Sequence, residues 1–237
     1  MTIETIVTDV EGTTSSIAFV KDCLFPYAAE HLPDFVRRQA DEPAVAEQID
    51  AVRQAMGEAA ADLEQVIARL LRWIAEDVKA TPLKTLQGLV WRQGFEDGSL
   101  QAPVYDDAWA CLQRWQAAGY RLAVYSSGSV QAQRLFFGHT EHGDLSSLFS
   151  AHFDTTSGHK QEADSYRQIA TELAASEPAT LLFLSDVAAE CDAARAAGWQ
   201  TILVRRACET GQPPGEDGQP PYPVVPDFWD IDRWLAD

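Results

Sequence analysis

Short apolar segments rich in β-branched residues alternate with helix-like sequence along most of this chain of 237 residues. Near-continuous apolar strands are typical of a parallel sheet with helices on both faces, because each strand is then buried from both sides. The pattern therefore predicts an α/β fold built on a parallel, Rossmann-like sheet. The predicted strands are Thr5–Thr8, Arg121–Ser126, Ala151–Phe153, Leu181–Ser185 and Thr201–Val204.

About 110 residues without a convincing strand separate the first predicted strand from the second, far more than a normal connection. We therefore expect an inserted helical domain. Its clearest helix is predicted from Asp62 to Val78, where apolar residues recur at the spacing of one helix face. A second helix is expected after Pro82 and before Gly94. The predicted division is an α/β core over residues 1–15 and 103–237 and a helical domain over residues 16–102.

The charge balance is strongly acidic, with 36 Asp and Glu against 18 Lys and Arg and a formal net charge of −18. We therefore expect no nucleic-acid partner and no attraction to an anionic membrane. No apolar stretch approaches the roughly 20 residues that a transmembrane helix needs. The N-terminus lacks the basic start and long apolar stretch of a signal peptide, so a cytoplasmic location is expected. Without a coiled-coil pattern, we expect a monomer.

The four cysteines are scattered and form no Cys-x-x-Cys pair. This spacing favours neither a zinc site nor a disulfide framework. We expect reduced, mostly buried thiols, because free cysteine is commonly a small core residue.

Near the C-terminus, residues 211–226 contain half of the chain's 12 prolines. Proline and glycine at this density favour an irregular surface loop. A closing helix is expected after it, near Phe228–Leu235.

Acidic residues follow two of the predicted strands. Asp9 and Glu11 come directly after the first strand, and Asp186 follows the strand Leu181–Ser185, with Glu190 four residues later. In open α/β sheets the ligand crevice lies at the carboxyl ends of the strands. Hard oxygen ligands at two strand ends suit Mg²⁺. The alternative is that Asp186 only caps a turn and Glu190 lies on a solvated helix face.

Hydroxyl groups and one lysine follow the middle strands. Ser126, Ser127 and Ser129 surround a glycine after the second strand, where hydroxyls and backbone N–H groups can hold a phosphate at the start of a helix. Ser127 or Ser129 can equally be an N-cap. Lys160 lies in the loop after the third strand and can neutralise a phosphate dianion, although most lysines are simply exposed.

The order of these residues resembles the motif series of the haloacid dehalogenase superfamily, in which the sheet brings such strand ends together. The resemblance is closest to the enolase-phosphatases of methionine salvage. It covers the chain from Asp9 to Gly198 but not the proline-rich segment. The matching motifs are Asp9-Val10-Glu11-Gly12-Thr13-Thr14, Phe25-Pro26-Tyr27, Leu86-Gln87-Gly88, Tyr125-Ser126-Ser127-Gly128-Ser129 and Phe153-Asp154-Thr155 leading to Lys160.

The resemblance implies a role for each matched residue. Asp9 is implied to be the nucleophile that forms an aspartyl-phosphate. One Mg²⁺ is implied, held by Asp9, the Glu11 backbone carbonyl and Asp186. Ser126, Ser127 and Lys160 are implied to bind the phosphate, and Lys160 also to neutralise the nucleophile. Glu190 is implied to be an outer-shell acid that orients metal-bound water.

The resemblance also implies a reaction, that of acireductone synthase. A 2,3-diketo-5-methylthiopentyl 1-phosphate is first enolised, and the enol phosphate is then hydrolysed to 1,2-dihydroxy-3-keto-5-methylthiopentene and phosphate. Phosphatases of the wider superfamily carry Asp where this chain has Glu11, as the enolase-phosphatases do. Glu11 and His31 are the candidate bases for enolisation. The helical domain is implied to be a cap that excludes water and contacts the methylthio end of the substrate.

Two alternatives remain open at this point. A capped phosphatase of the same superfamily would act on another small phosphate ester without the enolase step. A phospho-accepting receiver module also combines Asp, a hydroxyl, Lys and Mg²⁺ on a parallel sheet, but its aspartate follows the third strand and no large insertion comes after it. Catalytic turnover of phosphate separates the last alternative from both enzymes.

Overall fold

The computed structural model describes residues 2–210 and 220–236. It divides into two compact units, one formed by residues 1–17 and 101–237 and the other by residues 18–100. The divisions fall within two residues of those expected from the sequence. We call the first the α/β unit and the second the helical unit.

The α/β unit is built on a six-stranded sheet in the order β3-β2-β1-β4-β5-β6, and all paired strands are parallel. The predicted fold class is confirmed. The five predicted strands are present, with ends that shift by two residues or fewer. The strands are β1 Thr5–Thr8, β2 Arg121–Tyr125, β3 Phe149–Phe153, β4 Leu181–Ser185, β5 Gln200–Val204 and β6 Val224–Val225.

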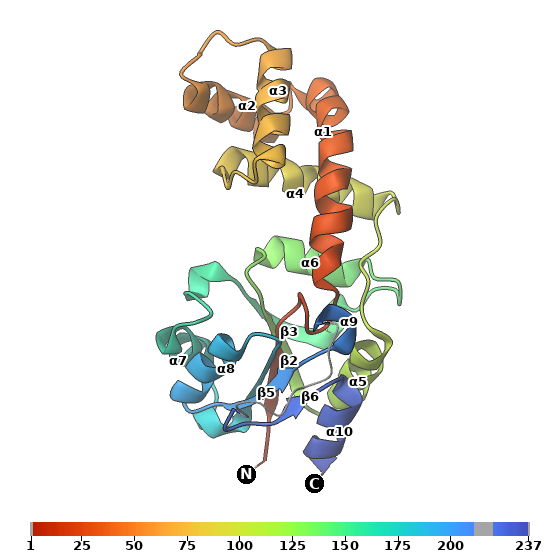
Figure 1. Cartoon of the computed structure of the whole chain (residues 1–237), viewed down its shortest axis with the longest axis vertical. Helices are drawn as coiled ribbons and strands as arrows, with labels where there is room; N and C mark the ends of the chain where they lie inside the picture. The colour runs from red at the N-terminus through yellow and green to blue at the C-terminus, as the bar shows by residue number, and fades with distance from the viewer. Residues whose placement is uncertain (1, 211–219, 237) are drawn as a thin grey trace. The chain divides into compact units, whose positions relative to one another are not determined.

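Helices cover both faces of this sheet, as Figure 1 shows, with α5 and α10 on one side and α7 and α8 on the other. Alternate strand residues are divided between the two layers: Ile6 packs with the α5 and α10 side chains, and Val7 with those of α7 and α8. The helices of the unit are α5 Asp106–Ala117, α6 Val130–Gly138, α7 Ala163–Glu172, α8 Ala188–Ala196, α9 Ala207–Thr210 and α10 Phe228–Ala236. Short 3₁₀ turns occupy Ser146–Leu148, Thr155–Ser157 and Pro178–Thr180.

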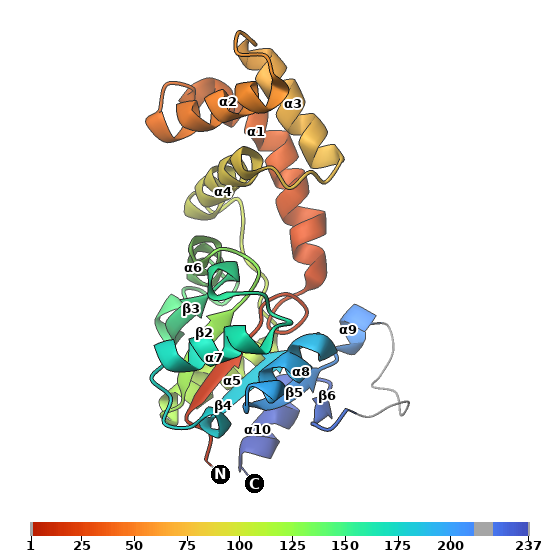
Figure 2. The ribbon, with the colours of Figure 1, turned by 90° about the vertical axis from the view of Figure 1, so that its left-hand side faces the viewer.

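The proline-rich segment corrects one prediction. Residues 211–219 lie outside the described residues, but Val224–Val225 forms β6 beside β5 instead of irregular loop (Figure 2). The Arg205 N–H donates to the Val225 carbonyl at 2.8 Å. Proline is tolerated next to such a short edge strand, because an edge needs hydrogen bonds on only one side. The predicted closing helix is present as α10.

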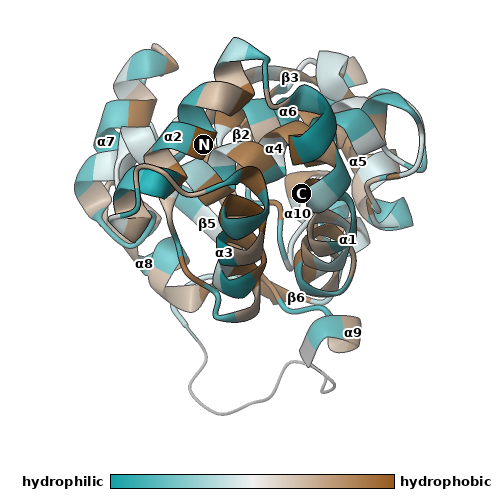
Figure 3. Ribbon diagram, turned by 90° about the horizontal axis from the view of Figure 1, so that it is seen from above, coloured by the Kyte–Doolittle hydropathy of each residue, from teal (hydrophilic) through white to brown (hydrophobic). Residues whose placement is uncertain are grey.

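The helical unit contains four α-helices, preceded by π-helical turns at Phe19–Leu24. The two predicted helices correspond to α3 and α4, and α1 and α2 were not anticipated. Bands of hydrophobic and hydrophilic residues alternate along α3 in Figure 3, as expected of an amphipathic helix. The α-helices are α1 Phe25–Gln39, α2 Pro43–Met56, α3 Leu63–Ala75 and α4 Thr81–Glu96.

One apolar cluster joins these four helices. Leu32, Ile49, Leu70 and Leu86 each represent one helix in it and are almost fully buried. Asp62 caps α3 through a capping box with Gln65.

The four cysteines differ in their exposure to solvent. Cys111 and Cys191 are buried, but Cys23 and Cys208 are exposed, so the expectation of mostly buried thiols is wrong for half of them. All four are free thiols.

Within the part of the chain that the structure describes, no helix is both long and apolar enough to cross a membrane.

Candidate active site

The candidate site lies where the strand order of the sheet changes direction, between β1 and β4. These strands pair in parallel, with Thr8 opposite Leu184. Asp9 and Asp186 follow them directly, and the Asp9 N–H donates to the Leu184 carbonyl at 2.9 Å. In doubly wound sheets this point leaves a crevice at the strand ends, where ligands bind. The topology therefore places Asp9 and Asp186 at neighbouring strand ends.

The loop after β1 forms a tight turn that holds Asp9. The N–H groups of Thr13, Thr14 and Ser15 all donate to the Val10 carbonyl, at 3.0 to 3.2 Å. Gly12 has φ +75°, in the left-handed region that glycine adopts at little cost. From outside the loop, the Nε–H of the buried Arg206 donates to the Thr13 carbonyl at 2.8 Å.

Asp186 lies against this turn. A Cβ atom placed on Gly12 would come within 2.3 Å of Asp186 Oδ2, so only glycine leaves room for the carboxylate. Burial raises the pKa of Asp186 to about 6, and the nearby Glu190 carboxylate adds to the shift. The Asp186 carboxylate is therefore brought to the loop that Asp9 begins.

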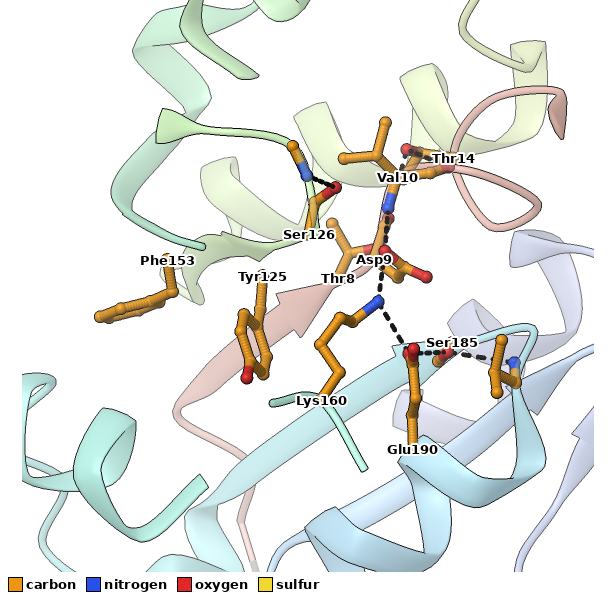
Figure 4. Close-up of polar contacts among 12 residues, drawn as sticks. Thr8, Asp9, Val10, Thr14, Tyr125, Ser126, Phe153, Lys160, Ser185 and Glu190 are labelled. Atoms are coloured by element: carbon orange, nitrogen blue, oxygen red, sulfur yellow. Dashed lines mark hydrogen bonds and ion pairs between the residues drawn. The ribbon is translucent and has the colours of Figure 1, made fainter. Parts of the chain in front are cut away.

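Lys160 joins two of the predicted acids. Its Nζ lies 2.7 Å from Asp9 Oδ1 and 2.7 Å from Glu190 Oε2 (Figure 4). Lys160, Asp9 and Glu190 are 6%, 5% and 8% exposed, so water screens these contacts weakly. The alternative of a solvated surface lysine is wrong for Lys160, and Glu190 does not lie on a solvated helix face.

The pKa values in this group follow from one cation shared between two carboxylates. Burial opposes the charge on Lys160, but the attraction of Asp9 and Glu190 outweighs it, and the pKa of Lys160 is raised. Because Lys160 pairs with both Asp9 and Glu190, its attraction lowers the pKa of Asp9 only in part. Burial therefore dominates and raises the pKa of Asp9 to about 7, while Lys160 opposes the shift.

Ser185 completes the group from the last residue of β4. Its Oγ–H donates to Glu190 Oε2 at 2.8 Å, and its Oγ accepts the Val187 N–H at 3.1 Å. These bonds fix the carboxylate of Glu190 toward Lys160. Glu190 thus positions Lys160, a contact that the sequence patterns did not indicate.

The serines after β2 take different positions. Ser126 is buried, and its Oγ accepts the Gly128 N–H at 3.2 Å, which leaves its hydroxyl proton free to be donated to an anion. Ser127 is exposed. Ser129 is the N-cap of α6 and accepts the Ala132 N–H at 3.2 Å. The capping alternative therefore holds for Ser129, and Ser126 and Ser127 remain the candidates for phosphate.

Asp154 explains why the loop after β3 lies beside these serines. Its Oδ2 accepts the Val130 N–H at 3.0 Å, and its Oδ1 accepts the Thr156 N–H at 2.9 Å. One side chain thus joins the start of α6 to the loop that leads toward Lys160.

The donor set suits a hard divalent cation. Asp9, Asp186 and Glu190 supply three carboxylates, and the one ammonium of Lys160 pairs with Asp9 and Glu190, so a divalent ion would balance the remaining charge. Among the residues that the structure describes, no three His, Cys, Asp or Glu side chains are grouped to hold a metal by themselves. A metal would therefore take backbone carbonyl, water or substrate oxygens besides two carboxylates. Mg²⁺ commonly binds in this way.

The two candidate bases for enolisation lie in different units. The side chain of Glu11 is exposed in the turn after Asp9. His31 lies on α1 of the helical unit, with its ring 4.1 Å from that of Tyr27 between centroids. The two rings are tilted by 32° to each other, so His31 has a local ring contact within the helical unit.

Comparisons with known proteins identify the family of this chain. The family described as haloacid dehalogenase-like hydrolase matches residues 3–198. Proteins named "Enolase-phosphatase E1" from Azotobacter vinelandii and Pseudomonas aeruginosa are 59% and 57% identical, each over 98% of this chain and 98% or more of the relative. The solved structure of the UTR4 protein from Saccharomyces cerevisiae is 36% identical, with a TM-score of 0.79 over 95% of this chain and 98% of that one.

These relatives match the chain across both units, and their identity is far above what a shared fold alone produces. Enzymes of this kind are generally metal-dependent, in agreement with the acidic donor set. The chain belongs to the enolase-phosphatase E1 family of the haloacid dehalogenase-like hydrolases.

Proposed function

We propose that this enzyme enolises 2,3-diketo-5-methylthiopentyl 1-phosphate and then hydrolyses the enol phosphate, with Asp9 as nucleophile. The observation that carries the assignment is the buried contact of Asp9 with Lys160, which is itself held by Glu190, beside Asp186 at the switch point of the sheet. A buried carboxylate held against one ammonium at the carboxyl ends of the strands is suited to phosphoryl transfer. Methionine salvage is the pathway that this reaction serves.

The Asp9 carboxylate is oriented before substrate arrives. Its Oδ1 accepts the Val10 N–H at 2.8 Å and the Lys160 ammonium at 2.7 Å. These bonds leave Oδ2 to attack phosphorus. The new bond joins this oxygen to phosphorus, the bond from phosphorus to the enol oxygen breaks, and the enolate departs. Water then hydrolyses the aspartyl-phosphate to free Asp9 and inorganic phosphate.

Lys160, Ser126 and Ser127 are proposed to bind the transferring phosphoryl group. The ammonium of Lys160 neutralises both the nucleophile and the phosphate, and the Ser126 hydroxyl donates to a phosphate oxygen. Preorganised donors in a buried site stabilise developing charge more strongly than water does. An enolate is less basic than a simple alkoxide, so its departure depends less on a strong general acid.

One Mg²⁺ per subunit is the proposed metal, held by Asp9, Asp186 and the Glu11 backbone carbonyl. When bound, it supplies Lewis-acid stabilisation of charge on the phosphoryl group and on an enolate. Glu190 is proposed to orient metal-bound water in addition to its contact with Lys160.

Enolisation needs a base for the carbon-bound proton, and Glu11 is the preferred candidate over His31. Glu11 belongs to the same turn as Asp9, whereas the His31 ring contacts that of Tyr27 in the helical unit. The helical unit is proposed to be the cap that excludes water and contacts the methylthio group.

The deciding experiment incubates the protein with the diketone phosphate and follows enol absorbance and phosphate release together. Both signals are expected with Mg²⁺, and both should disappear with excess EDTA and return with added Mg²⁺. Phosphate release without the enol signal would support the phosphatase alternative without an enolase step. Activity unchanged by EDTA would contradict the metal assignment.

The proposal includes three expectations about the whole protein: it is a monomer, it is located in the cytoplasm, and it has no nucleic-acid partner. The net charge of −18 is the sequence property behind the last of them. Light scattering coupled to gel filtration measures the first, and a mass of two subunits would contradict it.

A further inference from the structure

Lys160 lies in a loop outside regular secondary structure, yet its ammonium is placed between two carboxylates. The 3₁₀ turn before it ends at Ser157, and α7 begins only at Ala163. A lysine side chain has four rotatable bonds, so its accurate placement requires a fixed backbone beneath it. The contacts of this backbone therefore decide how well Lys160 is preorganised.

Side-chain hydroxyls hold three consecutive carbonyls of this loop. Tyr125 Oη–H donates to the Gly158 carbonyl at 3.0 Å, and Ser165 Oγ–H donates to the His159 carbonyl at 2.8 Å. Tyr166 Oη–H donates to the carbonyl of Lys160 itself at 2.7 Å.

The two tyrosine rings are fixed in turn by the core of the α/β unit. Tyr125 and Tyr166 are fully buried and meet edge to face, with ring centroids 5.5 Å apart. Both also contact the ring of Phe183, at 6.3 and 5.2 Å between centroids. Phenylalanine would fill nearly the same space, so what each tyrosine adds here is a hydroxyl bond to the Lys160 loop.

The same rings lie beside the lysine head group. Lys160 Nζ lies 5.9 Å from the centroid of the Tyr125 ring and 6.0 Å from that of Phe183, and Figure 4 shows Tyr125 next to the lysine stem. Tyr125 therefore bonds to the loop backbone through its hydroxyl and lies beside the Lys160 ammonium with its ring.

Glycine at position 158 is required by this arrangement. Its φ of +115° lies in the region that favours glycine, and a Cβ atom there would come within 2.2 Å of Ser165 Oγ. The loop thus passes too close to the start of α7 for any side chain.

We propose that Tyr166 and Tyr125 are positioning residues for Lys160, which hold its ammonium where the phosphate of the substrate and of the product binds. The inference rests on the proposed function of Lys160 and deepens it. Tyr166 carries the larger part, because its hydroxyl holds the carbonyl of Lys160 directly.

The test measures kcat, KM and the affinity for inorganic phosphate, determined by calorimetry in the presence of Mg²⁺. Tyr166→Phe is expected to weaken phosphate binding and lower kcat/KM by about three- to tenfold, as for the loss of one buried hydrogen bond, and Tyr125→Phe by less. Tyr120→Phe is the matched control, since its hydroxyl bonds to none of the described residues. It should change neither quantity. Unchanged phosphate affinity in Tyr166→Phe, with the control behaving as expected, would overturn the inference.

A double-mutant cycle separates positioning from general destabilisation. In a Lys160→Met background, Tyr166→Phe should have no further effect on phosphate affinity, because the group that it positions is gone. An equal loss in both backgrounds would show that Tyr166 acts through the fold alone and would overturn the inference. Melting temperatures of all variants verify that the proteins compared are folded.

The cycle also distinguishes this inference from the proposed function. If Lys160→Met itself binds phosphate normally, the assignment of Lys160 is wrong and the positioning role falls with it. If Lys160→Met weakens phosphate binding to a measurable lower affinity while Tyr166→Phe binds phosphate normally, only the positioning role is wrong.

Discussion

The two units bury very different kinds of side chain. In the helical unit, all of whose residues are described, Gln87 is the only buried polar or charged residue. In its ion pairs, such as Arg53–Asp50, the acidic side chain is always largely exposed to solvent. The α/β unit buries Asp9, Lys160 and Glu190 together, and a second ion pair between Asp107 and Arg206.

The buried charges are concentrated in the α/β unit, where the proposed active site lies. A buried charge costs free energy unless it is paired, so an apolar core is the simpler way to stabilise a domain. The helical unit follows that way. The α/β unit instead keeps charges out of water near β1 and β4, where low screening would strengthen their action on the phosphate of the proposed substrate. The predictions below test this contrast, beginning with the largest effect.

Asp9→Asn should lower phosphatase turnover by about 10³-fold or more, because an amide is a poor nucleophile toward phosphorus. The amide is nearly isosteric, so the melting temperature should change little by comparison. Steady-state phosphate release and thermal denaturation measure the two effects. Residual turnover within tenfold of the wild type would remove Asp9 from the nucleophile role.

Leu70→Ala should destabilise the helical unit by about 2–5 kcal/mol, since Leu70 is fully buried among four helices. Denaturant unfolding followed by circular dichroism measures this change. The conservative Leu70→Met should cost less than about 1.5 kcal/mol. Equal losses for the two variants would argue against close packing at this position.

Gly12→Ala should lower turnover by about 10²-fold, because a Cβ atom at φ +75° would displace Asp186. Mg²⁺ affinity should fall with it, and calorimetric titration of the metal measures that loss. In the helical unit, Gly88 is the matched position, with no atom within 4 Å of an added Cβ. Gly88→Ala should instead stabilise the protein by about 0.5–1 kcal/mol, as alanine does within a helix. Normal metal binding in Gly12→Ala would contradict the close approach of Asp186.

Asp50→Asn should give the smallest effect, a loss of less than about 1 kcal/mol in the free energy of unfolding. Its ion pair with Arg53 is formed at 2.8 Å, but the Asp50 side chain is 66% exposed. Unfolding at low and high salt measures this change, which salt should diminish. A loss as large as that of Leu70→Ala would show that surface charge contributes to this unit as much as its core.

Local sequence patterns were sufficient to predict five strands of the sheet and two helices of the helical unit. The apolar strand segments and the long gap after β1 predicted a parallel sheet with a helical insertion. They did not predict α1, which contains Pro33, or α2, which begins at Pro43. Pro33 inside α1 is a local signal against helix, which packing in the shared apolar cluster outweighs, whereas Pro43 is at the first position of α2, where proline is favoured. They also missed β6, because a two-residue edge strand forms only when β5 is already beside it.

At the site, residue types and their order named the acids, the serines and the lysine, because their chemistry is readable from a sequence. The contacts among these residues could not be predicted, since Lys160 lies 151 residues after Asp9 and 30 residues before Glu190 along the chain. Tyr166 and Ser185 gave no signal, and Tyr125 appeared only as part of a matching motif with no role assigned, because a buried hydroxyl and a plain core residue look alike along the chain.

The amino-acid sequence by itself determined the layer architecture, the place of the insertion and the identity of the reactive groups, because these depend on periodicity and on side-chain chemistry. Only the tertiary structure decided which carboxylate shares the ammonium of Lys160, which turn admits Asp186, and which hydroxyls fix the lysine loop. Those choices depend on distances between chain segments that meet only when the strands pair, so no local property of the sequence contains them.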